Sequence, residues 1–261
     1  MAWVSVDHSW VITFGILGNV ISLMVFLSPL PIFYRILQKK STEEFKSEPY
    51  IIALFSAMLW LYYAFIKTNE LLLIIVNSIG CIIEIFYITI FLIFAARKAR
   101  IYTAKLILIL IVGVFPMIVL ITLLLFRGSS RLQVLGWICV AFAVCVFAAP
   151  LSSMKRVIQT KSVEFMPFNL SLFLTLRGIS WLFYGLLSND IFLLLPNILG
   201  VTFGFLQLLL YFIYRGKEEV HKDRRVDKVG PEVDINMIVE ECFSDKKQDH
   251  NSSELRAEQI V

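Results

Sequence analysis

The chain contains two copies of one apolar unit. Residues 29–63 and 150–184 align without a gap at a constant spacing of 121 positions, and the alignment extends upstream of both segments. The matched residues include Pro29/Pro150, Leu30/Leu151, Arg35/Arg156, Gln38/Gln159, Ser41/Ser162, Trp60/Trp181 and Tyr63/Tyr184. A duplicated hydrophobic unit predicts a membrane carrier whose substrate path lies between the two copies.

Long stretches almost free of charge predict an all-α membrane protein. Hydrophobic residues make up 58% of the chain, and its mean hydropathy is +0.79. A helix of roughly 20 apolar residues spans a bilayer, because only helices and closed barrels satisfy the backbone there. Windows of that length predict seven transmembrane helices near residues 10–34, 49–66, 71–96, 104–126, 132–154, 167–187 and 191–214.

The two repeats each hold three of these helices. The first repeat covers residues 8–96 and the second 132–214, and the region 97–131, which matches neither, supplies a linker helix. An odd number of helices per repeat, with one helix between the repeats, gives both copies the same orientation. The sequence therefore predicts two parallel repeats in a three, one, three arrangement.

The positive charges predict how the chain crosses the membrane. One set of alternate loops holds eleven Lys and Arg and the other set holds three. The positive-inside rule then places the N-terminus outside and the C-terminus in the cytosol. The polar residues 215–261, with nine basic and twelve acidic side chains, are expected to form a disordered cytosolic tail.

Two pairs of matched residues have the chemistry of a neutral-sugar site. Asn77 and Asn197 occupy corresponding places, and a buried amide offers donors and acceptors to sugar hydroxyls. Trp60 and Trp181 are also mates, and indole packs on the C–H faces of sugar rings. Helix-helix amide contacts and an interfacial tryptophan belt are the structural alternatives, but the duplication of both residue types favours a binding site.

Prolines mark the ends of helices at the cytosolic side. Pro29 and Pro150 end the first helix of each repeat, and Pro49 and Pro167 begin the second. Because proline removes a backbone hydrogen bond and permits a kink, these four positions are candidate hinges, with ordinary helix punctuation as the alternative.

Two ionisable residues fall inside predicted spans, where charge is costly. Glu84 lies seven residues after Asn77, about two turns along the same face of the helix. Arg177 has Ser56 as its repeat mate and lies one turn from Trp181. It has three possible roles: to pair with Glu84 and tune gating, to reshape the pocket toward a smaller or anionic ligand, or to point away from the pocket.

The chain resembles plant SWEET (MtN3/saliva) sugar transporters over residues 8–214. The resemblance rests on motifs that occur in order: FGILGNVISL at 14–23, KKSTEEFKSEPY at 39–50, ALFSAMLWLYY at 53–63, ICVAFAVCVFAAPL at 138–151, KSVEFMPF at 161–168 and PNILG at 196–200. In detail the chain is most similar to the sucrose-favouring clade.

The resemblance implies roles for particular residues. The paired Asn and Trp would line a central pocket, as would the positions Ser22, Val25, Ser56, Ala143, Val146 and Arg177. The four prolines would form a tetrad near the cytosolic gate. Tyr63 and Asp190, at the outer ends of two spans, would close the extracellular side.

The resemblance predicts a facilitative, bidirectional sugar uniporter of the plasma membrane that works by alternating access. We expect sucrose or hexoses as substrates, membrane lipid and further family members as partners in a homo- or hetero-oligomer, and neither an enzymatic activity, a cofactor nor a nucleic-acid partner. The alternatives are a carrier for another small metabolite, a seven-helix receptor, and a non-transporting subunit that modulates active relatives.

Overall fold

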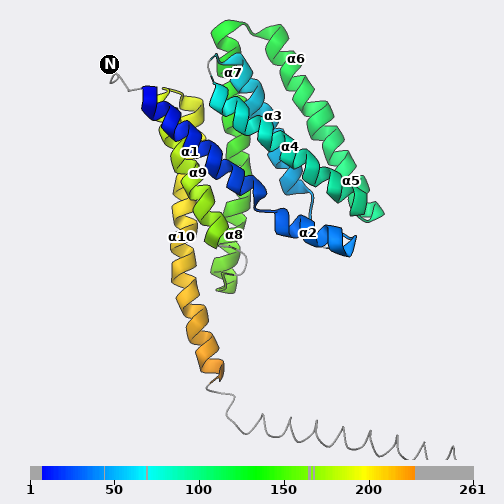
Figure 1. The fold of residues 1–261 in the computed structure, drawn as a ribbon, viewed down its shortest axis with the longest axis vertical. Helices are drawn as coiled ribbons and strands as arrows, with labels where there is room; N and C mark the ends of the chain where they lie inside the picture. Colours follow the sequence, from blue (N-terminus) through cyan, green and yellow to red (C-terminus); the bar gives the residue numbers. More distant parts are fainter. Residues whose placement is uncertain (1–7, 44, 69, 164–165, 167, 227–261) are drawn as a thin grey trace, which may run out of the picture. The chain divides into compact units, whose positions relative to one another are not determined.

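A computed structural model of the chain describes residues 8–43, 45–68, 70–163, 166 and 168–226. Within these residues the chain is helical throughout and contains no strand (Figure 1). In chain order the helices are α1 His8–Leu27, α2 Leu30–Lys39, α3 Glu48–Ile66, α4 Leu71–Phe94, α5 Arg97–Ile107, the π-helix η1 Leu108–Val114, α6 Phe115–Leu125, α7 Gly128–Val146, α8 Ala148–Thr160, α9 Phe168–Leu187 and α10 Ile191–Val226.

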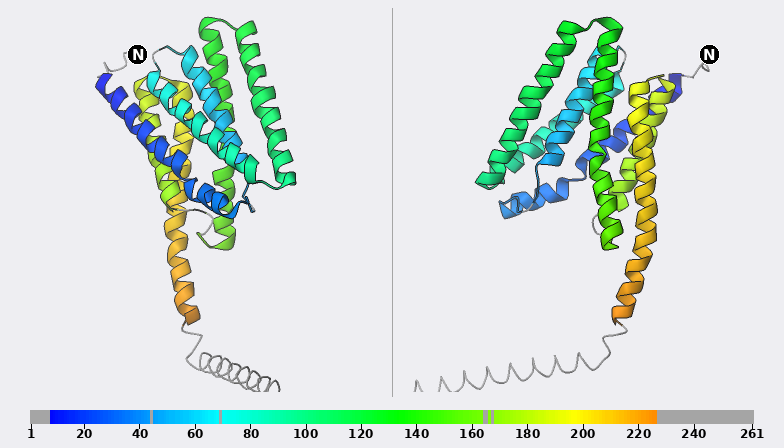
Figure 2. Two further views of the ribbon diagram at one scale, coloured as in Figure 1. Left: turned by 45° about the vertical axis from the view of Figure 1, so that its right-hand side comes forward. Right: turned by 180° about the vertical axis from the view of Figure 1, so that it is seen from behind.

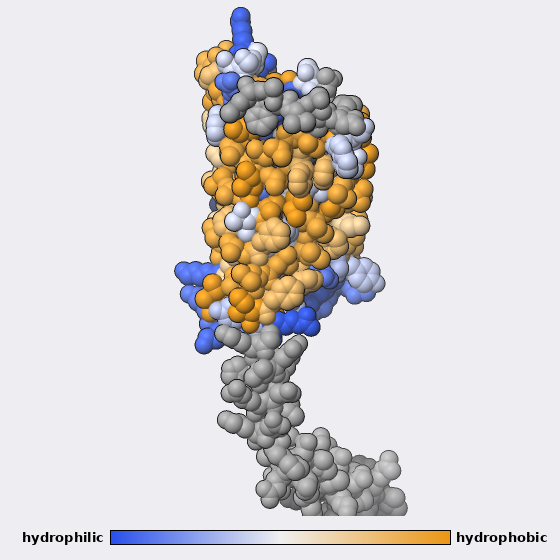
Figure 3. Space-filling model, turned by 90° about the vertical axis from the view of Figure 1, so that its left-hand side faces the viewer, coloured by the Kyte–Doolittle hydropathy of each residue, from blue (hydrophilic) through white to orange (hydrophobic). Residues whose placement is uncertain are grey.

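Seven of these segments are long and apolar enough to cross a membrane. They are Ser9–Lys39, Glu48–Ile66, Leu71–Phe94, Arg97–Leu125, Gly128–Thr160, Phe168–Leu187 and Ile191–Arg215. Large apolar side chains cover much of the outer surface, with Ile82 at 69% and Leu124 at 76% exposure. On the face in Figure 3 they form an apolar belt bordered by hydrophilic residues at both ends. The predicted all-α fold with seven spans is confirmed.

The chain divides into two compact units, Met1–Tyr211 and Phe212–Val261. The first unit contains all seven candidate spans apart from the last few residues of the seventh. In the second unit, α10 continues to Val226, so the tail expected from residue 215 begins within a helix. The remainder of that tail, 227–261, lies outside the described residues. The division into three, one and three helices remains a prediction.

The two predicted repeats meet along two pairs of helices. Within the first repeat, α4 packs against both α1 and α3, and between the repeats α1 packs against α9 and α3 against α7 (Figures 1 and 2). One buried core joins residues of both repeats, including Leu59 and Leu73 from the first and Leu135 and Leu193 from the second. The substrate path predicted between the repeats would therefore be bounded by α3, α4, α7, α9 and α10.

Small residues allow the helices to approach closely. Such close packing is expected in a membrane, because apolar side chains contact lipid tails as favourably as they contact other helices. A Cβ added at Gly185 in α9 would lie 3.0 Å from the backbone nitrogen of Leu194 and 3.1 Å from Cβ of Leu193 in α10. A Cβ at Gly204 in α10 would collide with the Thr175 side chain in α9. The α9–α10 contact thus depends on glycine at two positions.

The first span of each repeat is broken into two helices near a proline. Pro29 stands at the N-terminal cap of α2, and α2 turns away from the direction of α1 (Figures 1 and 2). In the second repeat the break falls at Phe147, and Pro150 is the third residue of α8, which continues more nearly along α7. Pro49 lies in the first turn of α3, whereas Pro167 lies outside the described residues.

The fourth span departs from a uniform α-helix. Residues Leu108–Val114 form a π-helix directly before Pro116, and the Phe115 amide donates to the Leu110 carbonyl five residues back. Proline lacks an amide hydrogen and its ring clashes with the preceding turn, so a wider turn is one way to keep the helix continuous. The sequence predicts one uninterrupted helix over residues 104–126, whereas in the structure this span begins at Arg97 and contains the π-helix η1.

Replacing Gly185 by alanine is expected to destabilise the bundle by about 1–3 kcal/mol, because the new methyl group meets backbone that cannot rotate away. Thermal unfolding of the purified protein in detergent measures this effect. Gly113→Ala is the matched control, since the nearest atom to its added Cβ lies 3.4 Å away, in its own helix. Equal melting temperatures for Gly185→Ala and the wild type would contradict the close contact.

Candidate functional site

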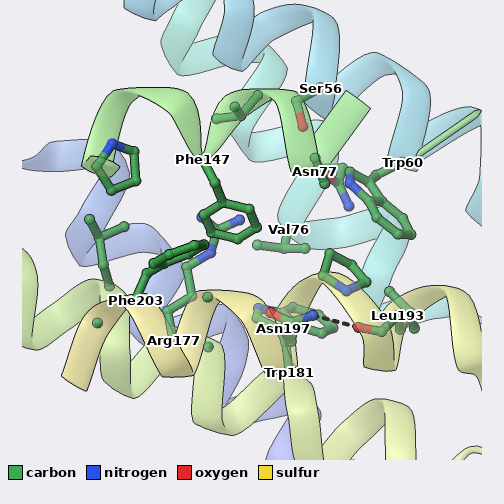
Figure 4. A pocket seen from close by; sticks show the side chains of 18 of the residues that line it. Ser56, Trp60, Val76, Asn77, Phe147, Arg177, Trp181, Leu193, Asn197 and Phe203 are labelled. Carbon is green, nitrogen blue, oxygen red and sulfur yellow. Dashed lines mark hydrogen bonds between the residues drawn. The ribbon is translucent and has the colours of Figure 1, made fainter. Parts of the chain in front are cut away.

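A cavity of about 330 Å³ lies between the two predicted repeats (Figure 4). Its walls come from α3 and α4 of the first repeat and from α7, α8, α9 and α10 of the second. This volume falls within the range of small-molecule binding sites, about 300–1,000 Å³. On α10 the lining residues run from Leu193 to Gln207, which corresponds to about 21 Å of helix at 1.5 Å per residue.

Most of the pocket residues predicted from the sequence line this cavity. They are Ser56, Trp60, Asn77, Ala143, Val146, Arg177, Trp181 and Asn197. Ser22 and Val25, both on α1, are not among the lining residues. Ser22 is fully buried behind the wall of the cavity, and Val25 is partly buried.

The two asparagines are held in the same way in both repeats. The Nδ2 atom of Asn77 donates to the Leu73 carbonyl at 2.8 Å, and Nδ2 of Asn197 donates to the Leu193 carbonyl at 2.7 Å. The dashed line in Figure 4 marks the second of these bonds. Each bond uses one N–H of the amide, which leaves the other N–H and the amide oxygen as groups for a ligand.

The two tryptophans also repeat their surroundings. Trp60 meets the Tyr63 ring edge-on with centroids 5.6 Å apart, and Trp181 meets Tyr184 in the same manner at 5.3 Å. Trp181 is the more buried of the two, and its indole N–H donates to the Ser22 hydroxyl oxygen at 3.1 Å. Edge contacts with the tyrosines fix both indole rings at the cavity wall.

Arg177 extends from α9 into the space that Phe147 and Phe203 line (Figure 4). Its Nε donates to the Ser22 hydroxyl oxygen at 3.1 Å, and its guanidinium carbon lies 5.8 Å from the centroid of the Phe26 ring. The ion pairs formed by the described residues do not include one between Arg177 and Glu84. Of the three roles considered for Arg177, the pocket position fits and the pairing with Glu84 does not.

Glu84 lies apart from the cavity, within α4. Its side chain is buried, and its Oε2 atom has no hydrogen-bond partner among the described residues. Glu84 does not line the cavity, and the structural role that the family resemblance implies for it stays a prediction.

A polar network joins the two repeats at the end of the bundle where α3 ends and α4 begins. The Tyr63 hydroxyl donates to Asp190 Oδ2 at 2.8 Å, and the Tyr184 hydroxyl donates to Glu70 Oε2 at 2.6 Å. Lys67 links the two carboxylates, with Nζ 2.6 Å from Asp190 Oδ2 and 2.7 Å from Glu70 Oε1. Each repeat thus gives one tyrosine and one carboxylate to a crossed pair of bonds.

The two carboxylates sit at equivalent places in the fold. Glu70 precedes α4, and Asp190 precedes α10, the third spanning helix of each repeat. Asp190 also caps its helix, because its Oδ1 accepts the backbone amides of Phe192 and Leu193 at 2.9 and 3.2 Å. Their side chains are almost completely buried, at 6% exposure for Glu70 and 1% for Asp190.

Sequence reasoning found Tyr63 and Asp190 but missed Tyr184, Glu70 and Lys67. The sequence contains a signal for Tyr184 and for Glu70. Tyr184 is the repeat mate of Tyr63, and Glu70 corresponds to Asp190 when TNELL at 68–72 is aligned with SNDIF at 188–192 at a spacing of 120. That spacing, one shorter than the main register, is the same as for Asn77 and Asn197.

Comparisons with known proteins identify the family. The family model described as "sugar efflux transporter for intercellular exchange" (MtN3_slv) matches residues 12–99 and again residues 133–219. Bidirectional sugar transporter SWEET15 of Oryza sativa subsp. japonica is 57% identical over 219 residues, which is 84% of this chain and 69% of that protein. Bidirectional sugar transporter N3 of Medicago truncatula is 50% identical over 238 residues, covering 90% of this chain and 89% of that protein.

The fold is similar to that of a solved eukaryotic SWEET transporter. The two structures superpose with a TM-score of 0.75 at 37% sequence identity, over 79% of this chain and 97% of the other. The resemblance drawn from the ordered motifs is therefore confirmed. With the family model matched twice and relatives about half identical in sequence, this chain belongs to the SWEET family of transporters.

Proposed function

We propose that this chain is a facilitative transporter that moves sugar in both directions across the membrane. The observation that carries the proposal is the cavity between the repeats, lined by a matched pair of asparagines and a matched pair of tryptophans. Amides hydrogen-bond to hydroxyls, and indoles pack on sugar C–H faces, so these pairs suit a neutral polyhydroxylated ring. Sucrose is our first candidate substrate, and hexoses come next.

The proposal of alternating access rests on the difference between the two ends of the helix bundle. The crossed network of Tyr63, Tyr184, Lys67, Glu70 and Asp190 supports closure of one end. The cavity reaches from the tryptophans to the residues near the helix breaks at the other end. We assign the closed end to the outside and the other to the cytosol, with Pro29, Pro49, Pro150 and Pro167 as hinges for the exchange between states.

The cavity chemistry supports transport without ion coupling. The described residues that line it include no Asp, Glu or His, the side chains that commonly relay protons in coupled carriers. A carrier of this kind equilibrates its substrate along the concentration gradient in either direction.

We base the membrane, the orientation and the oligomeric state that we propose on the family resemblance. We place the protein in the plasma membrane with the N-terminus outside, in accord with the excess of Lys and Arg in alternate loops. The fourth span is largely uncovered by the rest of the chain, with only 6% of its most apolar window buried. Membrane lipid or a neighbouring subunit of a homo- or hetero-oligomer would cover that surface.

Transport assays test this function directly. In proteoliposomes, radiolabelled sucrose and glucose should enter and leave at rates set by the sugar gradient alone, and trans-side sugar should accelerate exchange. A proton uncoupler should leave these rates unchanged. Loss of flux when the proton gradient collapses would overturn the uniporter mechanism, and absence of flux for every sugar would overturn the proposed function.

Trp60→Ala and Trp181→Ala should each weaken sugar transport, with the half-saturating concentration raised about fivefold or more, because each removes a stacking surface from the cavity. Concentration-dependent uptake measures the change. Trp10→Ala is the control, since Trp10 lies on α1, is 58% exposed and does not line the cavity. Equal effects of all three substitutions would argue against a sugar contact.

Tyr63→Phe and Tyr184→Phe should each shift the protein toward the state open to the outside. Each removes one hydrogen bond to a carboxylate, a contact worth about 1.5–3 kcal/mol. A cysteine at Ser56, in a background without the four native cysteines, should then react severalfold faster with an impermeant maleimide added outside.

Tyr62→Phe is the matched control for this experiment. It also removes a tyrosine hydrogen bond, but to Thr122 in the neighbouring α6 and not across the repeats. Labelling that stays at the wild-type rate in both network variants would show that these bonds do not hold the outer end closed.

A further inference from the structure

Arg177 places an unpaired positive charge in the wall of the transport cavity. Arg177 lies in the span Phe168–Leu187. An isolated charge inside a membrane span is energetically unfavourable and is usually paired with an opposite charge. Within the described part of the chain, Arg177 has no ion pair. The described residues that line the cavity include no acidic side chain either.

The contacts of Arg177 fix its position but use little of its bonding capacity. Nε donates to the Ser22 hydroxyl, and the Phe26 ring lies near the guanidinium plane. The hydrogen bonds of the described residues include none from its two Nη atoms. An arginine carries five N–H donors in a planar fork, so the edge that suits bidentate binding of a carboxylate or phosphate is left without a partner.

Both fixing contacts come from α1 and lie behind the cavity wall. Ser22 is fully buried and also accepts the indole N–H of Trp181. One hydroxyl oxygen therefore orients a stacking surface and a cation that both face the same cavity. Hydrogen bonds and packing from residues outside the cavity hold a binding group in a defined geometry.

We infer that the cavity binds a hydroxylated ligand bearing one anionic group, a carboxylate or a phosphate, with Arg177 as the residue that selects the charge. The inference rests on the proposed sugar pathway and adds charged sugars to the neutral candidates sucrose and hexoses. Asn77, Asn197 and the tryptophans bind the ring, and the free edge of the guanidinium binds the anion. Sugar acids and sugar phosphates have this combination of groups.

The repeat makes the inference specific to one side of the cavity. The mate of Arg177 is Ser56, which also lines the cavity but is neutral. The anionic group of the ligand would therefore lie toward α9, while the ring spans the matched pairs. The positive charge comes from the second repeat only, and a symmetric neutral ligand would not need it.

Binding measurements on the full-length protein in detergent test the inference. The probes are glucuronate for the carboxylate, glucose 6-phosphate for the phosphate, glucose as the neutral ring, and inorganic phosphate as the anion without a ring. The wild type should bind at least one of the two charged sugars about tenfold or more tightly than glucose. Inorganic phosphate should compete weakly.

Variants at Arg177 separate selection from structural support. Arg177→Gln should abolish the preference for the charged sugars over glucose, and Arg177→Lys should retain part of it, because lysine keeps the charge and loses the fork. Arg97→Gln is the control, since it removes one positive charge at an exposed position of α5. It should bind like the wild type.

The outcomes distinguish the inference from the function on which it rests. Sugar flux in proteoliposomes with no preference for either charged sugar would overturn the inference and leave the transport function standing. A preference that survives in Arg177→Gln would also overturn it, because the charge would then be recognised elsewhere. Absence of flux for sucrose and for every other sugar, together with absence of binding for all four probes, would overturn the proposed function itself.

Discussion

The crossed tyrosine–carboxylate bonds are the interaction by which, we propose, one end of this carrier is held closed. Within the membrane, apolar contact between helices gains little over contact with lipid, so polar contacts and close packing define how the repeats meet. Tyr63 reaches Asp190 and Tyr184 reaches Glu70, and Lys67 joins both carboxylates. Each repeat supplies the tyrosine donor for the other repeat's carboxylate, so the two tyrosine bonds form only when the repeats are together.

This reciprocity makes closure cooperative. Asp190 and Glu70 are nearly fully buried, and a buried charge that loses its partners is strongly unfavourable. Rupture of one bond would leave a carboxylate short of a donor in a low-dielectric site, whereas complete opening lets water solvate both. Intermediate states are therefore disfavoured, which agrees with the two arrangements of this end that the proposed alternating access requires.

The sequence predicted the elements of this mechanism better than their geometry. Seven spans followed from apolar length, and the paired asparagines and tryptophans followed from the repeat, because both depend on local sequence patterns. The other pocket positions followed from the family resemblance. Glu70 was missed because the turn before α4 is one residue longer than the turn before α10, which shifts the register from 121 to 120. The π-helix before Pro116 and the buried position of Ser22 depend on packing, which a one-dimensional pattern does not contain.

The cavity is asymmetric at one matched position. Both repeats supply an asparagine and a tryptophan to its wall, whereas the matched residues Ser56 and Arg177 differ in charge. The Ser22 hydroxyl on α1 of the first repeat holds Arg177 of the second, so the charge is anchored across the repeat interface. A change in the angle between α1 and α9 would move the guanidinium relative to Ser22, which links the strength of the charged site to the transport cycle.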